Sequence, residues 1–119
     1  MFRIEIPCLL PTFNDIVGKN RFIVSKLKNE LYQMMFVTLK ASKIPKPLHF
    51  PITLTIAQWC GRKGGRLRDV DSGSFAVKTF LDSLVKFDYL PDDSPKYVAF
   101  VHHQAPQKGK ADKTVFLIQ

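Results

Sequence analysis

Apolar and polar residues alternate along four short stretches of the chain, which is the pattern of a β-strand with one buried face. The stretches are residues 2–6, 52–59, 97–103 and 114–118, and the second is also rich in β-branched residues. Pro7 directly follows the first stretch and marks its end. We therefore expect four strands.

Two longer stretches place apolar residues at helical spacing instead. Residues 21–41 contain no Pro or Gly, and one stripe of this segment consists of Ile23, Leu27, Leu31, Met34, Thr38 and Ala41. Residues 72–87 show a similar pattern, with Val77, Phe80, Leu81, Leu84 and Phe87. The predicted fold class is α/β (α+β): a mixed sheet of about four strands packed with two helices, in the order β-α-β-α-β-β, as a single domain over 1–119.

The second half of the first helix is apolar almost all round, because residues 34–37 read Met-Met-Phe-Val. Such a segment is either enclosed in the core or part of a subunit interface. The sequence leaves both alternatives open.

Charge narrows the class of partner. The 119 residues include eighteen Lys and Arg against ten Asp and Glu, for a net charge of +8, so DNA or RNA is a better partner than an anionic membrane. The chain starts without the apolar run of a signal peptide and has no segment of transmembrane length, which predicts a cytoplasmic protein. Cys8 and Cys60 lie far apart, which argues against a disulfide framework or a structural zinc site.

The acidic residues are concentrated in one region. Six of the ten fall within residues 69–93, directly after the basic segment 62–68, which reads Arg-Lys-Gly-Gly-Arg-Leu-Arg. Crowded carboxylates repel one another unless a cation lies between them, and hard divalent ions prefer oxygen ligands. A basic flank beside such a cluster suits a polyanionic substrate. The combination predicts a metal-dependent nuclease.

Asp69 and Asp71 are separated by one residue, Val70. In an extended segment their side chains point to the same side, so both carboxylates can reach one ion. Asp71 also stands at a position where it can cap the following helix, and the residues alone do not decide between these roles.

Lys78 and three of the four acids that follow Asp71 in this region also have candidate roles. Lys78 can contact the scissile phosphate or the negative charge that develops during cleavage, or it can simply pair with Asp82 four residues on. Asp92 and Asp93 lie in a turn between two prolines, either as rigidly placed ligands or as ordinary turn residues.

The order of these motifs resembles the signature of a known family. The matching segments are Arg68-Asp69-Val70-Asp71, Lys78-x-x-x-Asp82-x-Leu84 and Leu90-Pro91-Asp92-Asp93, together with Ile6-Pro7-x-x-x-Pro11-x-x-Asn14 near the start. They are similar to the motifs of the RusA family of Holliday junction resolvases, which are typically carried by phages and prophages.

The resemblance implies a RusA-like fold and a magnesium-dependent, structure-selective crossover junction endodeoxyribonuclease acting in DNA recombination and repair. Asp69, Asp71 and Asp93 would bind Mg²⁺, for which Mn²⁺ can substitute, and Lys78 would be the catalytic lysine. The protein would be a homodimer that cuts two opposed strands of branched DNA in the cytoplasm of a bacterial host.

Further residues have supporting roles in this interpretation. The predicted DNA-binding residues are Arg62, Lys63, Arg66, Arg68 and Asn14, and the predicted supports of the metal ligands are Asp82, Asp92 and Ser72. Basic side chains of this kind position the phosphate backbone without reading sequence.

The chain departs from the family pattern at two places. Ser72 stands where the family commonly has Asn, and three more residues separate Asp71 from Lys78 than in the shorter family form. The departure at Ser72 motivates a second hypothesis, a catalytically weakened nucleic-acid-binding module of the same fold. A third is a cation-binding interaction protein of phage assembly. Asp93 is the preferred third ligand because it keeps the family spacing from Asp82, with Asp92 as the alternative.

Overall fold

The four predicted strands are present in the computed structural model, which describes residues 1–62 and 67–119. They are β1 (Phe2–Ile6), β2 (Ile52–Cys60), β3 (Val98–His103) and β5 (Lys113–Ile118), and a two-residue strand, β4 (Gln107–Lys108), adds a fifth to the described sheet. The sheet has the order β1-β5-β2-β3, and β4 pairs with the end of β2. It is mixed, as predicted, because β5 runs antiparallel to β1 and β2 whereas β3 runs parallel to β2.

The two long helices also form where the pattern predicts them. Helix α2 spans Arg21–Ala41, and α3 spans Ser74–Lys86 after a 3-10 turn, η1 (Val70–Gly73). A short helix, α1 (Phe13–Ile16), was not predicted. The buried residues of α2 are Leu31, Met35 and Leu39, so the predicted stripe was wrong by one position in its second half.

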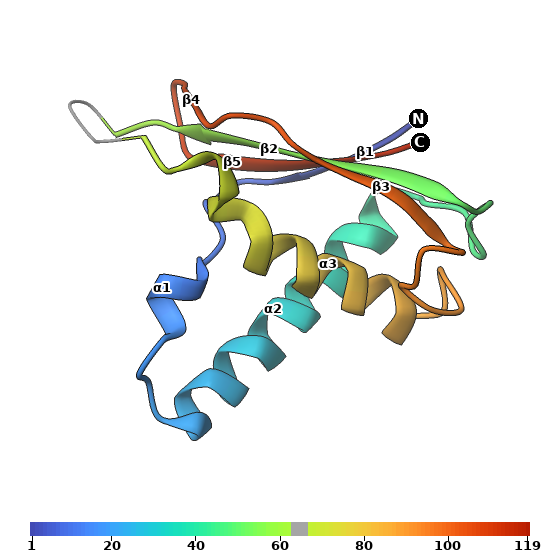
Figure 1. Cartoon of the computed structure of the whole chain (residues 1–119), viewed down its shortest axis with the longest axis horizontal. Helices are drawn as coiled ribbons and strands as arrows, with labels where there is room; N and C mark the ends of the chain where they lie inside the picture. The colour runs from blue at the N-terminus through green and yellow to red at the C-terminus, as the bar shows by residue number, and fades with distance from the viewer. Residues whose placement is uncertain (63–66) are drawn as a thin grey trace.

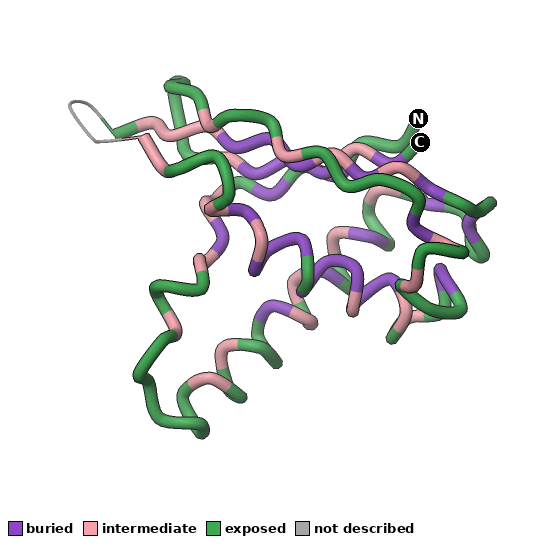
Figure 2. Tube along the Cα trace, in the orientation of Figure 1, coloured by how far each residue is buried: buried purple, intermediate pink, exposed green. Residues whose placement is uncertain are grey.

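The helices lie on one face of the sheet and leave the other face without a covering helix (Figure 1). The core lies between the two layers, where the Phe80 ring of α3 stacks on Phe116 of β5 with 4.1 Å between ring centroids. The first turns of α2 extend beyond the core and are largely exposed (Figure 2). Ile23, at 55% exposure, is therefore a surface residue although it has helical spacing from the core positions.

The apolar segment of α2 divides between core and surface. Met35 is fully buried, whereas Val37 is 65% exposed and Phe36 is 37% exposed. Phe36 packs against Phe87 at the end of α3, with 4.9 Å between their ring centroids. One part of the segment is thus enclosed in the core, and the other is available to a partner.

The connection from β2 through α3 to β3 fixes where the acidic residues lie. Because β2 and β3 are parallel, α3 must return from the carboxyl end of β2 to the amino end of β3. The residues before and after α3 are therefore at opposite ends of a helix about 20 Å long. No helix within the described ranges, 1–62 and 67–119, has the length and hydropathy needed to cross a membrane.

Candidate functional site

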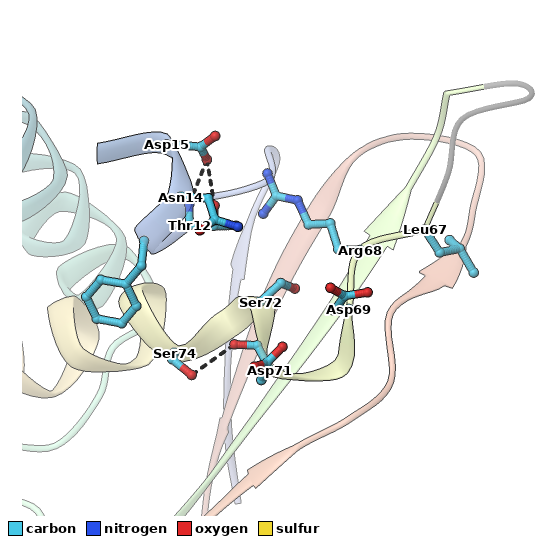
Figure 3. Close-up of a pocket in the computed structure, with 10 residues that line it drawn as sticks. Thr12, Asn14, Asp15, Leu67, Arg68, Asp69, Asp71, Ser72 and Ser74 are labelled. Carbon is cyan, nitrogen blue, oxygen red and sulfur yellow. Dashed lines mark hydrogen bonds between the residues drawn. The ribbon is translucent and has the colours of Figure 1, made fainter. Parts of the chain in front are cut away.

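Asp69 and Asp71 lie at an open pocket of about 540 Å³ between η1 and the N-terminal loop with α1. Figure 3 shows Asp69, Asp71 and Ser72 on the turn that leads into α3, and Thr12, Asn14 and Asp15 on the facing wall. The lining residues are Thr12, Phe13, Asn14, Asp15, Leu67, Arg68, Asp69, Asp71, Ser72 and Ser74. Of the predicted site residues, the pocket therefore unites Asn14, Arg68, Asp69, Asp71 and Ser72.

The wall that carries Asn14 is held by a local cap and one aromatic contact. The Asp15 carboxylate accepts hydrogen bonds from the Thr12 backbone N–H at 2.7 Å and from the Thr12 hydroxyl at 3.2 Å (Figure 3). The backbone N–H of Thr12 holds the pKa of Asp15 below its usual value. Phe13 packs edge-on against Phe75 at the start of α3, which fixes α1 relative to the acidic turn.

The carboxylates of Asp69 and Asp71 are exposed, and the segment is held by groups around them. The Ser72 N–H donates to the Asp69 carbonyl at 3.0 Å, and the Ser74 hydroxyl donates to the Asp71 carbonyl at 2.9 Å. Gly73, rather than Asp71, is the N-cap residue of α3. The alternative in which Asp71 caps the helix is therefore wrong, and its carboxylate is left at the pocket.

Arg68 points into the protein from the acidic turn. Its Nη1 donates to the Leu10 carbonyl at 2.6 Å and to Gln58 Oε1 at 3.2 Å. Figure 3 shows its guanidinium directed toward the loop that carries Thr12 and Asn14. Arg68 thus connects the two walls of the pocket, and its predicted contact with DNA stays a prediction.

Gln58 was not identified from the sequence, although it contacts both flanks of the acidic pair. It lies on β2 with 3% exposure, and its Nε2 donates to the Ser72 hydroxyl at 3.3 Å. The one available signal was its position, since it follows Ile52, Leu54 and Ile56 on the inward face of the strand. A glutamine that interrupts such an apolar series requires hydrogen-bond partners in the core.

Lys78 and Asp82 form the predicted ion pair on α3. Their side chains are 3.8 Å apart, and that of Lys78 is 64% exposed. An exposed pair of this kind contributes at most about 0.5 kcal/mol, so the lysine is easily released to another anion. Burial and the nearby Asp82 carboxylate raise the pKa of Tyr32 on α2.

Asp92 and Asp93 lie beyond the other end of α3. The Asp93 N–H donates to Asp92 Oδ1 at 2.8 Å, which holds the pKa of Asp92 below its usual value. Among the described residues, no three His, Cys, Asp or Glu side chains lie close enough to hold a metal ion together. A single chain therefore does not bring Asp93 to Asp69 and Asp71, and their joint role in metal binding stays a prediction.

The basic segment is described only at its ends. Arg62 is exposed just after β2, where the Gly61 N–H donates to Asp112 Oδ1 at 2.8 Å. Lys63 and Arg66, which are predicted to bind DNA, lie outside the described residues.

No protein-family model matches the chain, and no curated protein matches it significantly.

Proposed function

We propose that this protein is a magnesium-dependent, structure-selective endodeoxyribonuclease of the RusA type that resolves four-way junctions or related branched DNA. The observation that carries the proposal is the pair of exposed carboxylates, Asp69 and Asp71, on an anchored turn at an open polar pocket. A basic segment, residues 62–68, leads directly into this turn. Carboxylates beside cationic side chains suit a metal-dependent reaction on a phosphodiester.

The donor set at the turn fits magnesium. Mg²⁺ commonly keeps several waters and is held by one or two carboxylates together with substrate phosphates. Asp69 and Asp71 provide two carboxylates, and neither is enclosed in the core. When bound, the ion supplies activation of water and stabilisation of the departing oxygen.

The remaining residues of the site orient the substrate. Asn14, on the wall facing the acidic turn, offers an amide to the DNA backbone, and Arg62 offers a cation at the rim of the basic segment. Lys78 leaves its weak ion pair with Asp82 and neutralises charge on the scissile phosphate. None of these contacts reads a base, so selectivity arises from DNA shape.

The position of Asp93 requires a second chain if it is the third ligand. Strand β3 forms one edge of the sheet, its amino end follows the Asp93 turn, and η1 packs beside β3. Antiparallel pairing of β3 with the same strand of a second copy places the amino end of one strand beside the carboxyl end of the other. Asp93 of the partner subunit then approaches the turn with Asp69 and Asp71, on the helical side of a continuous sheet.

The exposure of β3 supports this dimer. Phe100 is 62% exposed and Val101 is 36% exposed, and the strand contains neither Pro nor Lys, which commonly protect an edge from pairing. A two-fold dimer of this kind also carries two sites, as paired cutting of opposed strands requires.

The separation of Asp93 from Asp69 and Asp71 within one chain favours a second candidate function, a nucleic-acid-binding module without cleavage. A test of both uses a synthetic four-way junction incubated with the protein in Mg²⁺ or in chelator. We expect paired cuts in Mg²⁺ and binding alone in chelator. Asp71→Asn should lower cutting at least about 100-fold, because it removes a charged ligand, while junction binding is kept or tightened.

The matched control is Asp88→Asn, since Asp88 is an exposed acid at the other end of α3 and has no predicted role. Binding of the junction without cutting by the wild-type protein would support the binding module. Full cutting by Asp71→Asn would refute the assigned ligand.

A further inference from the structure

We infer that Gln58 is a positioning residue that holds both flanks of the Asp69–Asp71 pair in the geometry needed to bind a divalent cation. The inference rests on the proposed function and deepens it, since it names a residue behind the ligands. It starts from the burial of Gln58, which is 3% exposed on the inward face of β2. A buried amide requires partners for its donors and its acceptor.

The two partners of this amide stand on either side of the acidic pair in the sequence. Gln58 Oε1 accepts from Arg68, the residue before Asp69, at 3.2 Å. Gln58 Nε2 donates to Ser72, the residue after Asp71, at 3.3 Å. One rigid strand residue therefore fixes the start and the end of the segment that carries both carboxylates.

The surroundings leave little freedom for this arrangement. A Cβ atom added to Gly73 would lie 2.9 Å from Ile56 Cδ1 and 3.2 Å from Gln58 Nε2, so η1 is packed directly on β2. Arg68 extends the connection to the Leu10 carbonyl at 2.6 Å, and thus to the opposite wall of the pocket. The Ser72 hydroxyl, which stands at the family's common Asn position, serves here as the acceptor that completes the clamp.

Groups that orient metal ligands typically change metal affinity or activity by about 10-fold to 100-fold when they are removed. We therefore expect Gln58→Leu, which keeps the side-chain size but removes both hydrogen bonds, to weaken Mn²⁺ binding about 10-fold or more. Mn²⁺ is the probe because its free fraction is measured directly by electron paramagnetic resonance. Amide hydrogen exchange at Ser72 and Gly73 should accelerate, while exchange in the middle of α3 stays unchanged.

A rescue variant and a control separate positioning from general stability. Gln58→Glu keeps an acceptor for Arg68 and can accept from the Ser72 hydroxyl, so it should retain Mn²⁺ affinity within about 3-fold of the wild type. Thr79→Val removes a different buried hydrogen bond, from Thr79 Oγ1 to the Phe75 carbonyl at 2.9 Å. This control should leave Mn²⁺ binding and exchange at Ser72 unchanged.

Two outcomes overturn the inference. One is unchanged exchange at Ser72 and Gly73 in Gln58→Leu, and the other is an equal loss of Mn²⁺ binding in Thr79→Val. Failure of the wild-type protein to bind Mn²⁺ or cut a junction has a different meaning, because it removes the proposed function. In that case the hydrogen exchange still decides whether Gln58 holds the turn.

Discussion

The acids before helix α3 and the acids after it form two similar pairs in the sequence, but the protein holds them in different ways. Asp69 and Asp71 are on a turn whose flanks are bound to a buried glutamine and whose carboxylates reach an open pocket. Asp92 and Asp93 are on an exposed loop, where Asp92 accepts a hydrogen bond from the next backbone N–H. The first pair is anchored to the sheet, and the second is organised by its own turn.

The contrast shows that acids crowded in the sequence are not necessarily crowded in space. A helix of 13 residues is about 20 Å long and lies between the two pairs. If the pairs act together, they must do so between chains, because the two-fold axis of a dimer can bring opposite ends of equivalent elements together. The same contrast is the reason for proposing that the anchored pair, rather than the loop pair, has the main role in metal binding.

The largest expected effect comes from mixing two variants with impaired sites, which tests whether the two pairs of acids act together between chains. Asp71→Asn and Asp93→Asn alone should each cut much less than the wild type, by at least about 100-fold and about 10-fold respectively, because each lacks one ligand of every site. When the two variants are mixed and allowed to exchange subunits, about half of the dimers contain one chain of each kind. Each mixed dimer has one intact site, made of Asp69 and Asp71 from one chain and Asp93 from the other, so junction nicking should return.

The readout is the nicking of a labelled junction after subunit exchange. A mixture of Asp69→Asn with Asp71→Asn is the control, since both changes affect the same half of the site and no mixed dimer is intact. Activity that stays low in the Asp71→Asn and Asp93→Asn mixture would mean that Asp93 does not complete the site across chains.

A second prediction concerns the β3 edge that would join the two chains. Phe100→Lys places a charge on the edge strand at a position that is 62% exposed, so it should disturb pairing with little effect on the monomer fold. Light scattering should give twice the 13.6 kDa chain mass for the wild type and the chain mass for the variant at micromolar concentration. Cutting should fall together with the dimer fraction and recover at high protein concentration.

Phe36→Asp on α2 is the matched comparison. Phe36 is a partly exposed residue of the apolar segment 34–37, which lies on the side of the sheet that the helices cover. It should remain dimeric if β3 forms the interface. A monomeric Phe36→Asp beside a dimeric Phe100→Lys would move the interface to α2.

Much of the fold was predictable because its main elements have strong periodic patterns. Helix α2 and strand β1 have the predicted bounds, and β2, β3 and β5 differ from them by one residue. Strand β4 has only two residues, too few to show alternation. Helix α1 is a single turn, and its stability depends on the Thr12–Asp15 cap and on contact with Phe75, which local periodicity does not reveal.

The candidate site was predictable only in part, and the missing part is tertiary. The spacing of Asp69 and Asp71 was enough to mark them as a pair. Arg68 was expected to bind DNA from its charge, yet it bonds to a carbonyl 58 positions away, a contact that charge does not predict. The separation of Asp93 was not predicted, because the resemblance placed it with Asp69 and Asp71 at one metal site, although a helix of the predicted length between them already keeps the two ends apart within one chain.

The smallest predicted effect concerns the choice between Asp92 and Asp93 in the loop after α3. Asp92→Asn keeps an oxygen that can accept the Asp93 N–H, so cutting should stay within about 3-fold of the wild type, whereas Asp93→Asn should lower it at least about 10-fold. The Asp93 N–H lowers the pKa of Asp92, so this carboxylate stays ionised at neutral pH and gains its proton at a lower pH than an ordinary aspartate. A titration of the carboxyl carbon by nuclear magnetic resonance should show the lowered value. A larger loss of cutting in Asp92→Asn than in Asp93→Asn would make Asp92 the ligand and Asp93 its support.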